Sequence, residues 1–482
     1  MIYKNIYRCA IDIAHLSFGG IALLLDKLKN NADSDILPMH MPGHKRNVGL
    51  LGNELPYRLD ITEISGFDDL HEMRGVLRTL AEIAASLYGA VFAFPMVNGS
   101  TGGVLAAVRA AAGFEPGGSI VMSRVSHKSV FNAAELCSLS PVYIMPEQDG
   151  GVSPNYVESA LKSTGDVRCV VLTSPSYEGA VSDIAAIAEI THAHGVPLII
   201  DAAHGAHFGF SKHFPQNAVR LGADIEIVSL HKTLPALTQT SLLLVGHGGL
   251  VTELELERQL RVFETSSPSY VLLSSIDHCL KLLCDDGAML FGEYAENLRV
   301  FYEKTRNLVN LKVNNKQNIP GYDIGKIVIY TKKTNITGIK LQEMLRERYK
   351  IELEMAMPDF ALAMTSICDT RDSLTRLADA LMRIDAELWT ENRKVGEMYS
   401  LPKCALPPCE THRKNVEPVL LGEARGRMVV EYIWAYPPGV PLLVPGEVVD
   451  DGVICYMKWL QNEGITLRSD YGKLPQIMCA AG

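Results

Sequence analysis

Short apolar runs alternate with amphipathic stretches over residues 75–250. Residues 74–90 repeat their apolar positions at helical spacing, and residues 101–113, 128–139 and 184–195 also resemble helices. Six short apolar runs are expected to be strands, at residues 91–97, 119–123, 141–145, 168–174, 196–204 and 224–230. Strands that alternate with helices predict an α/β fold whose mainly parallel sheet is covered by helices on both faces.

The rest of the chain departs from this alternation. Residues 311–400 combine strand-like runs with two amphipathic helices, which predicts a smaller α+β domain. Residues 401–410 are rich in proline, as in a linker, and short β-type runs follow them. We therefore expect a major domain over residues 36–310, a C-terminal domain over residues 401–482, and an N-terminal extension at residues 1–35.

Composition narrows the class of protein. The chain has 482 residues, which is long for a single core, and its 47% hydrophobic and 21% charged residues are typical of a soluble globular protein. The net charge of −10 argues against nucleic acid as a partner. Ten cysteines without CxxC pairs indicate reduced thiols and a cytoplasmic location. Asp12 and His15 interrupt the apolar start, so we expect no signal peptide, and no apolar run is long enough to span a membrane.

Polar clusters follow several of the predicted strands. NGST comes after residues 91–97, SPSYEG after residues 168–173, DAAHGAH after residues 196–200, and SLHK after residues 224–228. Ligands of parallel sheets bind at the carboxyl ends of the strands. The sequence therefore places a binding site at this edge of the sheet.

Three components of these clusters suit pyridoxal phosphate (PLP). The amine of Lys232 can form a Schiff base with the aldehyde, and the carboxylate of Asp201 can keep the pyridine nitrogen protonated. Residues 98–101 open a Gly- and Ala-rich helix whose N–H groups can bind phosphate. Taken singly, such a lysine is most often a surface residue, and the other two are most often helix caps. Their order, each at a strand end, favours PLP.

Eight short motifs together resemble the Orn/Lys/Arg decarboxylase family. They run from about residue 38 to about residue 447 and are MHMPGHK, DDLHE, NGSTGG, SHKSV, PSYEG, DAAHGAHFGF, SLHKTLPALTQT and YPPGVPLLVPGE. The resemblance implies a fold-type-I PLP enzyme with an aspartate-aminotransferase-like major domain, in the short form that lacks an N-terminal wing domain. The sequence departs from the family at Ala202, where an acidic residue is frequent.

The resemblance implies a role for each residue around the cofactor ring. Lys232 would be the Schiff-base lysine, and Asp201 would hold the pyridine nitrogen. His127 would stack on the ring; its alternative is an ordinary loop histidine. Ala203 and His204 would line the other face or the edge of the ring.

The same resemblance implies a phosphate site and a dimer. Ser100 and Thr101 would hold the phosphate together with Ser229. Thr265 and Ser266, in ETSSPSY, resemble a stretch that reaches the phosphate of a neighbouring subunit. A homodimer or higher homo-oligomer with a shared active site is therefore expected.

The implied reaction is loss of CO₂ from a basic amino acid. His231 would contact the phosphate or a reaction intermediate, and either it or the Schiff-base lysine would supply a proton to the α-carbon. The distal cation of the substrate requires carboxylates or aromatic rings, and the candidates are Asp68, Asp69, Glu431 and Glu447. Arginine is favoured over lysine and then ornithine, with a role in polyamine synthesis.

Two other functions stay open at this point: an aminotransferase or β-elimination lyase on the same fold, and a PLP-binding protein without activity. No metal is expected, although three histidine pairs stand close in sequence, because no third and fourth ligand follows at suitable spacing. These pairs are His40 and His44, His192 and His194, and His204 and His207. The sequence also has no P-loop motif for a nucleotide.

Overall fold

A computed structural model describes residues 24–113, 115–147, 150–314, 321–393, 400–436 and 439–481. Most of the expected N-terminal extension, residues 1–23, lies outside the described residues. So do Pro437 and Pro438 of the motif YPPGVPLLVPGE.

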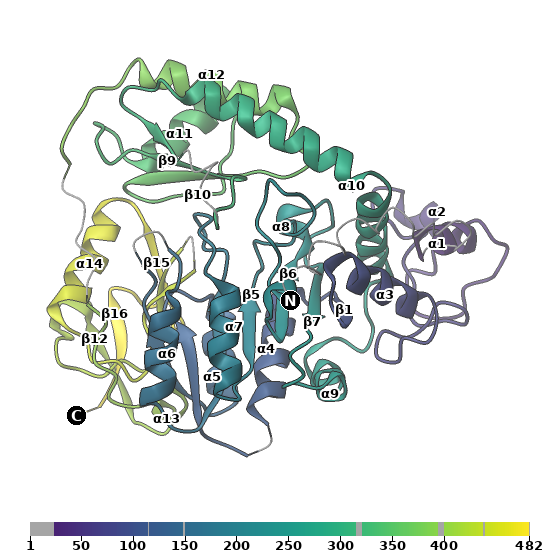
Figure 1. Cartoon of the computed structure of the whole chain (residues 1–482), viewed down its shortest axis with the longest axis horizontal. Coiled ribbons are helices and arrows are strands. Elements are labelled where there is room, and N and C mark those ends of the chain that lie inside the picture. The colour runs from purple at the N-terminus through teal and green to yellow at the C-terminus, as the bar shows by residue number, and fades with distance from the viewer. Residues whose placement is uncertain are drawn as a thin grey trace, which may run out of the picture.

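A seven-stranded sheet forms the centre of the protein (Figure 1). In spatial order its strands are β1 (Phe92–Met96), β7 (Ser241–Val245), β6 (Ile225–Ser229), β5 (Leu198–Asp201), β4 (Val167–Thr173), β2 (Ser119–Ser123) and β3 (Ser140–Ile144). The five strands from β6 to β3 are parallel, and β7 is antiparallel to both of its neighbours. The mainly parallel sheet is thus confirmed, and the strand missed from the sequence is β7.

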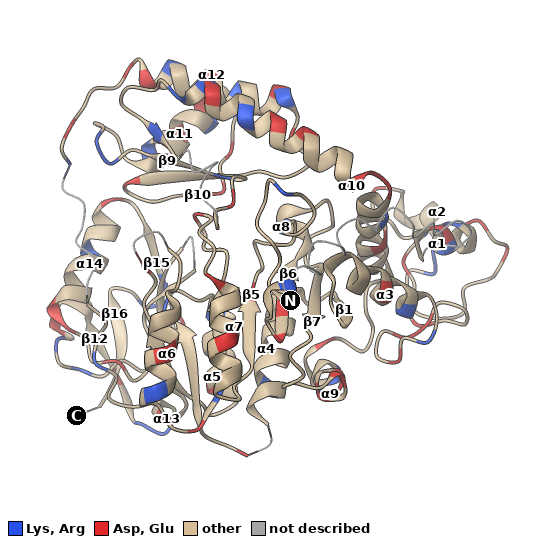
Figure 2. Ribbon diagram, viewed as in Figure 1, with Lys and Arg blue, Asp and Glu red and all other residues tan. Residues whose placement is uncertain are grey.

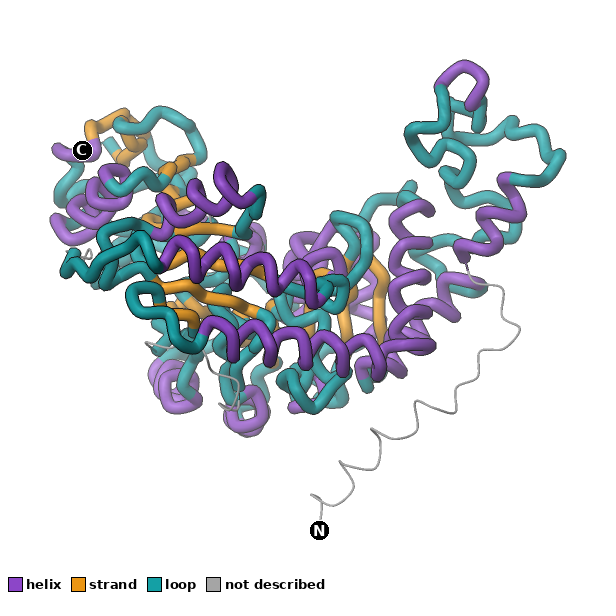
Figure 3. The backbone as a smooth tube through the Cα atoms, turned by 90° about the horizontal axis from the view of Figure 1, so that it is seen from above, coloured by secondary structure: helices purple, strands orange, loops and turns teal. Residues whose placement is uncertain are grey.

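Helices lie on both sides of the strands when the molecule is seen from above (Figure 3). α4 packs with α5 and α9, while α6 packs with α7. The bounds are α3 (Val76–Tyr88), α4 (Gly99–Ala112), α5 (Lys128–Leu136), α6 (Pro154–Ser163), α7 (Ile184–Ala193) and α9 (Glu253–Phe263). Because both faces are covered, the strands consist of nearly continuous apolar residues instead of alternating ones.

A long helix, α10 (Tyr270–Thr305), leads from the central sheet to a second, antiparallel sheet. The order of that sheet is β10 (Met355–Ala356), β11 (Phe360–Met364), β9 (Lys326–Tyr330) and β8 (Lys312–Val313). Its helices are α11 (Gly338–Tyr349) and α12 (Arg371–Asp385), and α12 packs on α10. Charges of both signs are interspersed along α10 and α12 (Figure 2).

The C-terminal part has its own apolar cluster, which includes Val429, Ile433, Val453 and Ile477. Its elements are α13 (Pro408–Thr411), β12 (Val416–Leu420), β13 (Ile433–Tyr436), β14 (Pro441–Leu443), α14 (Asp451–Asn462), β15 (Thr466–Ser469) and β16 (Gln476–Ala480). The order of its three-stranded sheet is β14-β13-β15, and β12 pairs with β16. The domain boundaries expected near residues 310 and 400 stay predictions.

Residues 33–60, here called the arm, project from the body of the protein (Figures 1 and 3). The arm follows α1 (Leu24–Ala32), which packs on α10, and it contains the short helix α2 (Val48–Leu51). Among the described residues, no helix is both long enough and apolar enough to cross a membrane.

Candidate active site

The carboxyl ends of β5 and β6 place three of the expected residues at one edge of the sheet. Asp201 is the last residue of β5, Ser229 is the last residue of β6, and Lys232 follows in the single helical turn α8 (Leu230–Thr233). The parallel pairing sets Asp201 opposite Ile227. Asp201 is 3% exposed, and its Oδ1 accepts a hydrogen bond from the Ala203 N–H at 3.2 Å.

The buried environment changes the pKa of the Lys232 amine. Burial lowers the pKa of Lys232, and the nearby carboxylates of Asp201 and Glu354 offset part of that effect. A lysine with a lowered pKa supplies a neutral amine more readily, as an amine that attacks an aldehyde must. The structure therefore brings Lys232 and Asp201 within electrostatic range of each other.

His127 has a structural reason to sit at this edge. It is the N-cap of α5, and its Nδ1 accepts a hydrogen bond from the Ser129 N–H at 3.2 Å and lies 2.9 Å from Ser129 Oγ. Burial lowers its pKa, while Asp201 raises it and Lys232 lowers it. Ser129 therefore orients the ring of His127, and burial disfavours its cationic form.

Two of the expected phosphate-binding residues lie at the start of α4. Gly99, the first residue of α4, has a φ of +69°. Its N–H donates at 2.9 Å to the carbonyl of Gln239, in the segment 230–240 that carries Lys232 and is here called the lysine loop. Ser100 is partly buried and Thr101 is exposed in the same first turn, while the N-cap Asn98 makes no side-chain capping bond. Free N–H groups at this helix start are suited to an anion.

Glu264 fixes the neighbouring segment and was missed in the sequence. Its Oε2 accepts hydrogen bonds from the N–H groups of Val97 at 3.1 Å and Asn98 at 3.3 Å, and its Oε1 accepts one from Thr265 N–H at 3.0 Å. Thr265 and Ser266 therefore lie next to the start of α4 in their own chain. The signal available was the acidic residue that opens ETSSPSY.

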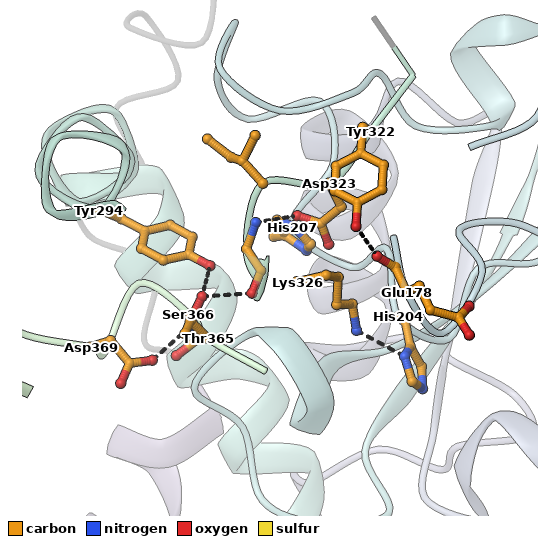
Figure 4. A network of polar contacts seen from close by, with 12 residues as sticks. Glu178, His204, His207, Tyr294, Tyr322, Asp323, Lys326, Thr365, Ser366 and Asp369 are labelled. Atoms are coloured by element: carbon orange, nitrogen blue, oxygen red, sulfur yellow. Dashed lines mark hydrogen bonds and ion pairs between the residues drawn. The ribbon is translucent and has the colours of Figure 1, made fainter. Parts of the chain in front are cut away.

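His231 and His204 are both held in place by hydrogen bonds. The Nδ1–H of His231 donates to the Thr240 carbonyl at 2.9 Å, and burial lowers its pKa. His204, three residues after Asp201, is buried with Ala203, and its Nδ1 lies 2.9 Å from the amine of Lys326 (Figure 4). Lys326 opens β9 and was missed in the sequence, where its signal was a lone cation at the start of an apolar strand.

The four carboxylates expected to meet the distal cation of the substrate have other partners. Asp68 accepts hydrogen bonds from four backbone N–H groups around the start of α3, at 2.7–3.1 Å, and Asp69 accepts one from His71 at 2.7 Å. Glu431 accepts hydrogen bonds from two backbone N–H groups, at 2.6 and 3.2 Å. Glu447 is paired with Arg124.

Glu354, which was not singled out in the sequence, lies nearer to the lysine. Its Oε1 accepts a 3.4 Å hydrogen bond from the Tyr177 hydroxyl, and the Tyr177 ring packs edge-on against His204. Its charge acts on both Lys232 and Lys326. Glu354 directly precedes β10 of the second sheet, so no local sequence pattern connects it to the site.

The three histidine pairs do not form metal sites in the described part of the chain, where no group of three potential ligands occurs. One histidine of each pair is instead bonded to a carboxylate. These contacts are His44 to Asp60 at 3.1 Å, His192 to Asp224 at 2.8 Å, and His207 to Asp323 at 3.1 Å.

Comparisons with known proteins identify related sequences. Residues 24–356 match the family model "Orn/Lys/Arg decarboxylase, major domain", and residues 393–466 match its C-terminal domain. The arginine decarboxylase of Bacillus subtilis (strain 168) is 30% identical over 455 residues, which cover 89% of this chain and 91% of the relative.

The chain belongs to the Orn/Lys/Arg decarboxylase family. The predicted resemblance and the decarboxylase activity are thereby confirmed.

Two solved structures confirm the fold of this decarboxylase. The lysine decarboxylase of Francisella novicida superposes with a TM-score of 0.79 at 17% identity and covers 96% of this chain and 81% of its own. An alanine–glyoxylate aminotransferase from Nostoc sp. gives 0.52 at 14% identity and covers 64% of this chain and 86% of its own. The expected fold-type-I architecture is therefore confirmed.

The decarboxylase contains groups that fit PLP. The Oγ of Ser229 is fully buried at the sheet edge and has no hydrogen-bond partner among the described residues. The hydroxyls of Thr233, in the lysine loop, and Ser241, which follows it, are likewise buried and unpartnered within that part of the chain. Buried hydroxyls of native proteins normally have partners, so a phosphate bound here would supply them.

Proposed function

We propose that this protein is a PLP-dependent decarboxylase that acts on a basic amino acid, with arginine favoured over lysine and then ornithine. The observation that carries the proposal is the placement of Asp201 and Lys232 at the ends of adjacent strands. There the carboxylate of Asp201 raises the pKa of Lys232, against the effect of burial. The curated relative named arginine decarboxylase supports arginine as the favoured substrate. A role in polyamine synthesis, a cytoplasmic location and a homodimer are parts of the same proposal.

Each residue has a defined task in this reaction. PLP, when bound, supplies a protonated ring that accepts the electrons of the breaking C–C bond. Asp201 would keep the proton on the pyridine nitrogen, and His127 would stack on the ring. Lys232 would hold the aldehyde group of the cofactor, and either Lys232 or His231 would supply a proton to the α-carbon of the substrate.

Phosphate binding fixes the cofactor for this chemistry. Ser100 and Thr101 at the start of α4 and the unpartnered Ser229 hydroxyl are the proposed ligands. Holding the phosphate at this place would fix the cofactor relative to Lys232, and orientation of the scissile bond is where such a site contributes most. Burial of the same edge also disfavours the charge of the substrate carboxylate, which is lost with CO₂.

The distal cation of the substrate needs an acidic partner. Four carboxylates remain candidates for this partner, although each already has hydrogen-bond or ion-pair partners within the chain. They are Asp68, Asp69, Glu431 and Glu447. Glu354 is added as a candidate because its charge acts on Lys232 and its carboxylate accepts a hydrogen bond from the Tyr177 hydroxyl. A carboxylate of this kind suits the guanidinium or ammonium group of a basic amino acid.

The arm is the proposed contact with a second copy of the chain. It carries seven exposed large apolar side chains, and such clusters mark protein interfaces. They are Ile36, Leu37, Met39, Met41, Leu50, Leu51 and Leu55. Substitution of Leu37 and Leu50 with Glu is expected to halve the mass measured by sedimentation, whereas Val309→Glu, which alters an equally exposed apolar residue on another face, leaves it unchanged.

The purified protein tests the proposed reaction directly. Arginine, lysine and ornithine are each supplied with PLP, and CO₂ and the amine product are measured. Release of a keto acid without CO₂ indicates an aminotransferase, and release of ammonia a lyase. Borohydride reduction followed by peptide mapping should place the cofactor on Lys232; a label on another residue, or none, would contradict the assignment.

A further inference from the structure

A buried lysine of the second sheet is bonded to a histidine of the cofactor site. Lys326 Nζ lies 2.9 Å from His204 Nδ1, and the two residues are 1% and 7% exposed (Figure 4). Lys326 opens β9, while His204 follows β5 of the central sheet. The contact therefore joins two parts of the fold that are 122 residues apart in sequence.

The backbone around Lys326 is built to hold it at this place. The Asp323 N–H donates to the Gly179 carbonyl at 2.8 Å, and the Lys326 N–H donates to the Asp323 carbonyl at 3.1 Å. Gly179 has a φ of +103°, and a Cβ there would lie 3.0 Å from both Cβ and Cγ of Lys326. Glycine is thus required for the close approach that lets the lysine stem pass.

The contact determines where His204 carries its proton. An ammonium group only donates hydrogen bonds, so the Nδ1 of His204 must accept, and the single proton of a neutral imidazole then lies on Nε2. Burial, followed by the positive charges of Lys326 and Lys232, holds the pKa of His204 well below its usual value. Burial also lowers the pKa of Lys326 to about 8, and the nearby carboxylate of Asp323 opposes this shift and so favours the ammonium form.

We propose that Lys326 is a positioning residue, which holds His204 as the neutral tautomer protonated on Nε2. His204 then offers a hydrogen-bond donor to the bound cofactor without placing another positive charge near Lys232. The role of the donor rests on the proposed PLP function, whereas the tautomer itself does not.

The tautomer can be read in the unmodified protein. Nitrogen NMR of protein labelled with ¹⁵N-histidine distinguishes the two neutral forms and the cation, and His204→Gln identifies the signal of His204. At pH 7 the expected result is a neutral ring with the proton on Nε2. A ring protonated on Nδ1, or on both nitrogens, would overturn the proposal whether or not the protein binds PLP.

The effect on the cofactor is tested by a double-variant comparison in the holoenzyme. Lys326→Met should shift the midpoint of the pH titration of cofactor absorbance by about one unit or more. The same change made in the His204→Gln background should shift it little, because the lysine acts through the histidine. Equal shifts in both backgrounds would show a direct charge effect and refute the positioning role.

Two controls separate this result from other causes. Lys312→Met, on the exposed strand β8 of the same sheet, should leave the titration unchanged. If Lys326→Met does not fold, Lys326→Gln retains a donor for Nδ1 and should keep the wild-type NMR signal. A wild-type protein without cofactor absorbance would contradict the proposed function but leave the NMR result standing.

Discussion

Arg124 and Glu447 form a buried ion pair between the end of β2 and the loop that follows β14. The Nη2 atom of Arg124 lies 3.2 Å from both carboxylate oxygens, and the two side chains are 3% and 1% exposed. Arg124 Nη2 also donates to the Leu442 carbonyl at 3.2 Å, and the Val444 N–H donates to Glu447 at 2.8 Å. The pair connects the C-terminal part to the central sheet.

Loss of this pair should affect stability more than substrate binding. Glu447→Ala leaves the Arg124 cation buried without its carboxylate and should lower the free energy of unfolding by about 3–5 kcal/mol. Urea unfolding measures this change. A variant of normal stability with a strongly raised KM would instead assign Glu447 to the distal cation of the substrate.

Replacement of the anchoring amine should abolish the reaction. Lys232→Ala is expected to remove turnover and the absorbance of the covalently held cofactor while the thermal unfolding temperature changes little. Lys212→Ala, at an exposed lysine of the same domain, is the matched control and should behave like wild type. Retained turnover in Lys232→Ala would refute the assignment of the lysine.

Removal of the charge on Asp201 should slow the reaction without releasing PLP. Asp201→Asn keeps the shape of the side chain, but an amide stabilises the protonated pyridine nitrogen poorly, so kcat should fall about 10²- to 10³-fold. The phosphate ligands are unchanged, and equilibrium dialysis should still detect bound cofactor. Near-normal kcat would show that the ring nitrogen is held by another group.

Glu354 should affect the affinity for the substrate. Glu354→Gln removes one charged hydrogen bond to the distal cation and should raise KM for the preferred amino acid about tenfold to a hundredfold. Glu352→Gln, two residues earlier and also exposed, serves as the control. Equal KM values for the two variants would indicate that another carboxylate binds the distal cation.

Glu226 should make stability depend on pH. This residue of β6 is fully buried, and burial raises its pKa to about 7. Between pH 4.5 and 7 the folded state binds more protons than the unfolded state, so this contribution is complete below pH 4.5 and is lost as the pH rises through 7. Glu226→Gln should remove the loss, which amounts to about 3 kcal/mol. Parallel stability curves for both proteins from pH 5 to 8 would contradict this.

The sequence predicted the parts of the site that lie within single strand ends. Asp201 and Lys232 each follow an apolar run, so their shared edge could be inferred from the alternation of strands and helices. Lys326 and Glu354 could not be found this way, because they reach the site from a different sheet and their own segments carry no motif. The strand at residues 241–245 was missed because it is antiparallel and directly follows the lysine loop.

The roles of acidic residues were also hard to predict. Asp68 was selected as a partner for the substrate cation, but its carboxylate accepts four backbone hydrogen bonds before α3. A capping carboxylate and a substrate-binding carboxylate have the same sequence signature, and the difference lies in which N–H groups converge on them in three dimensions. The structure supplies that information for each of the four candidates.

The antiparallel direction of β7 has a consequence for engineering this enzyme. Because Ser229 lies opposite Ser241, the segment that carries Lys232 leaves and re-enters the sheet at adjacent positions, like the connection of a hairpin. The entropic cost of closing such a connection grows slowly with its length. The tip of the segment, near residues 235–238, can therefore be lengthened or randomised as a cassette while the lysine in its first turn keeps its place.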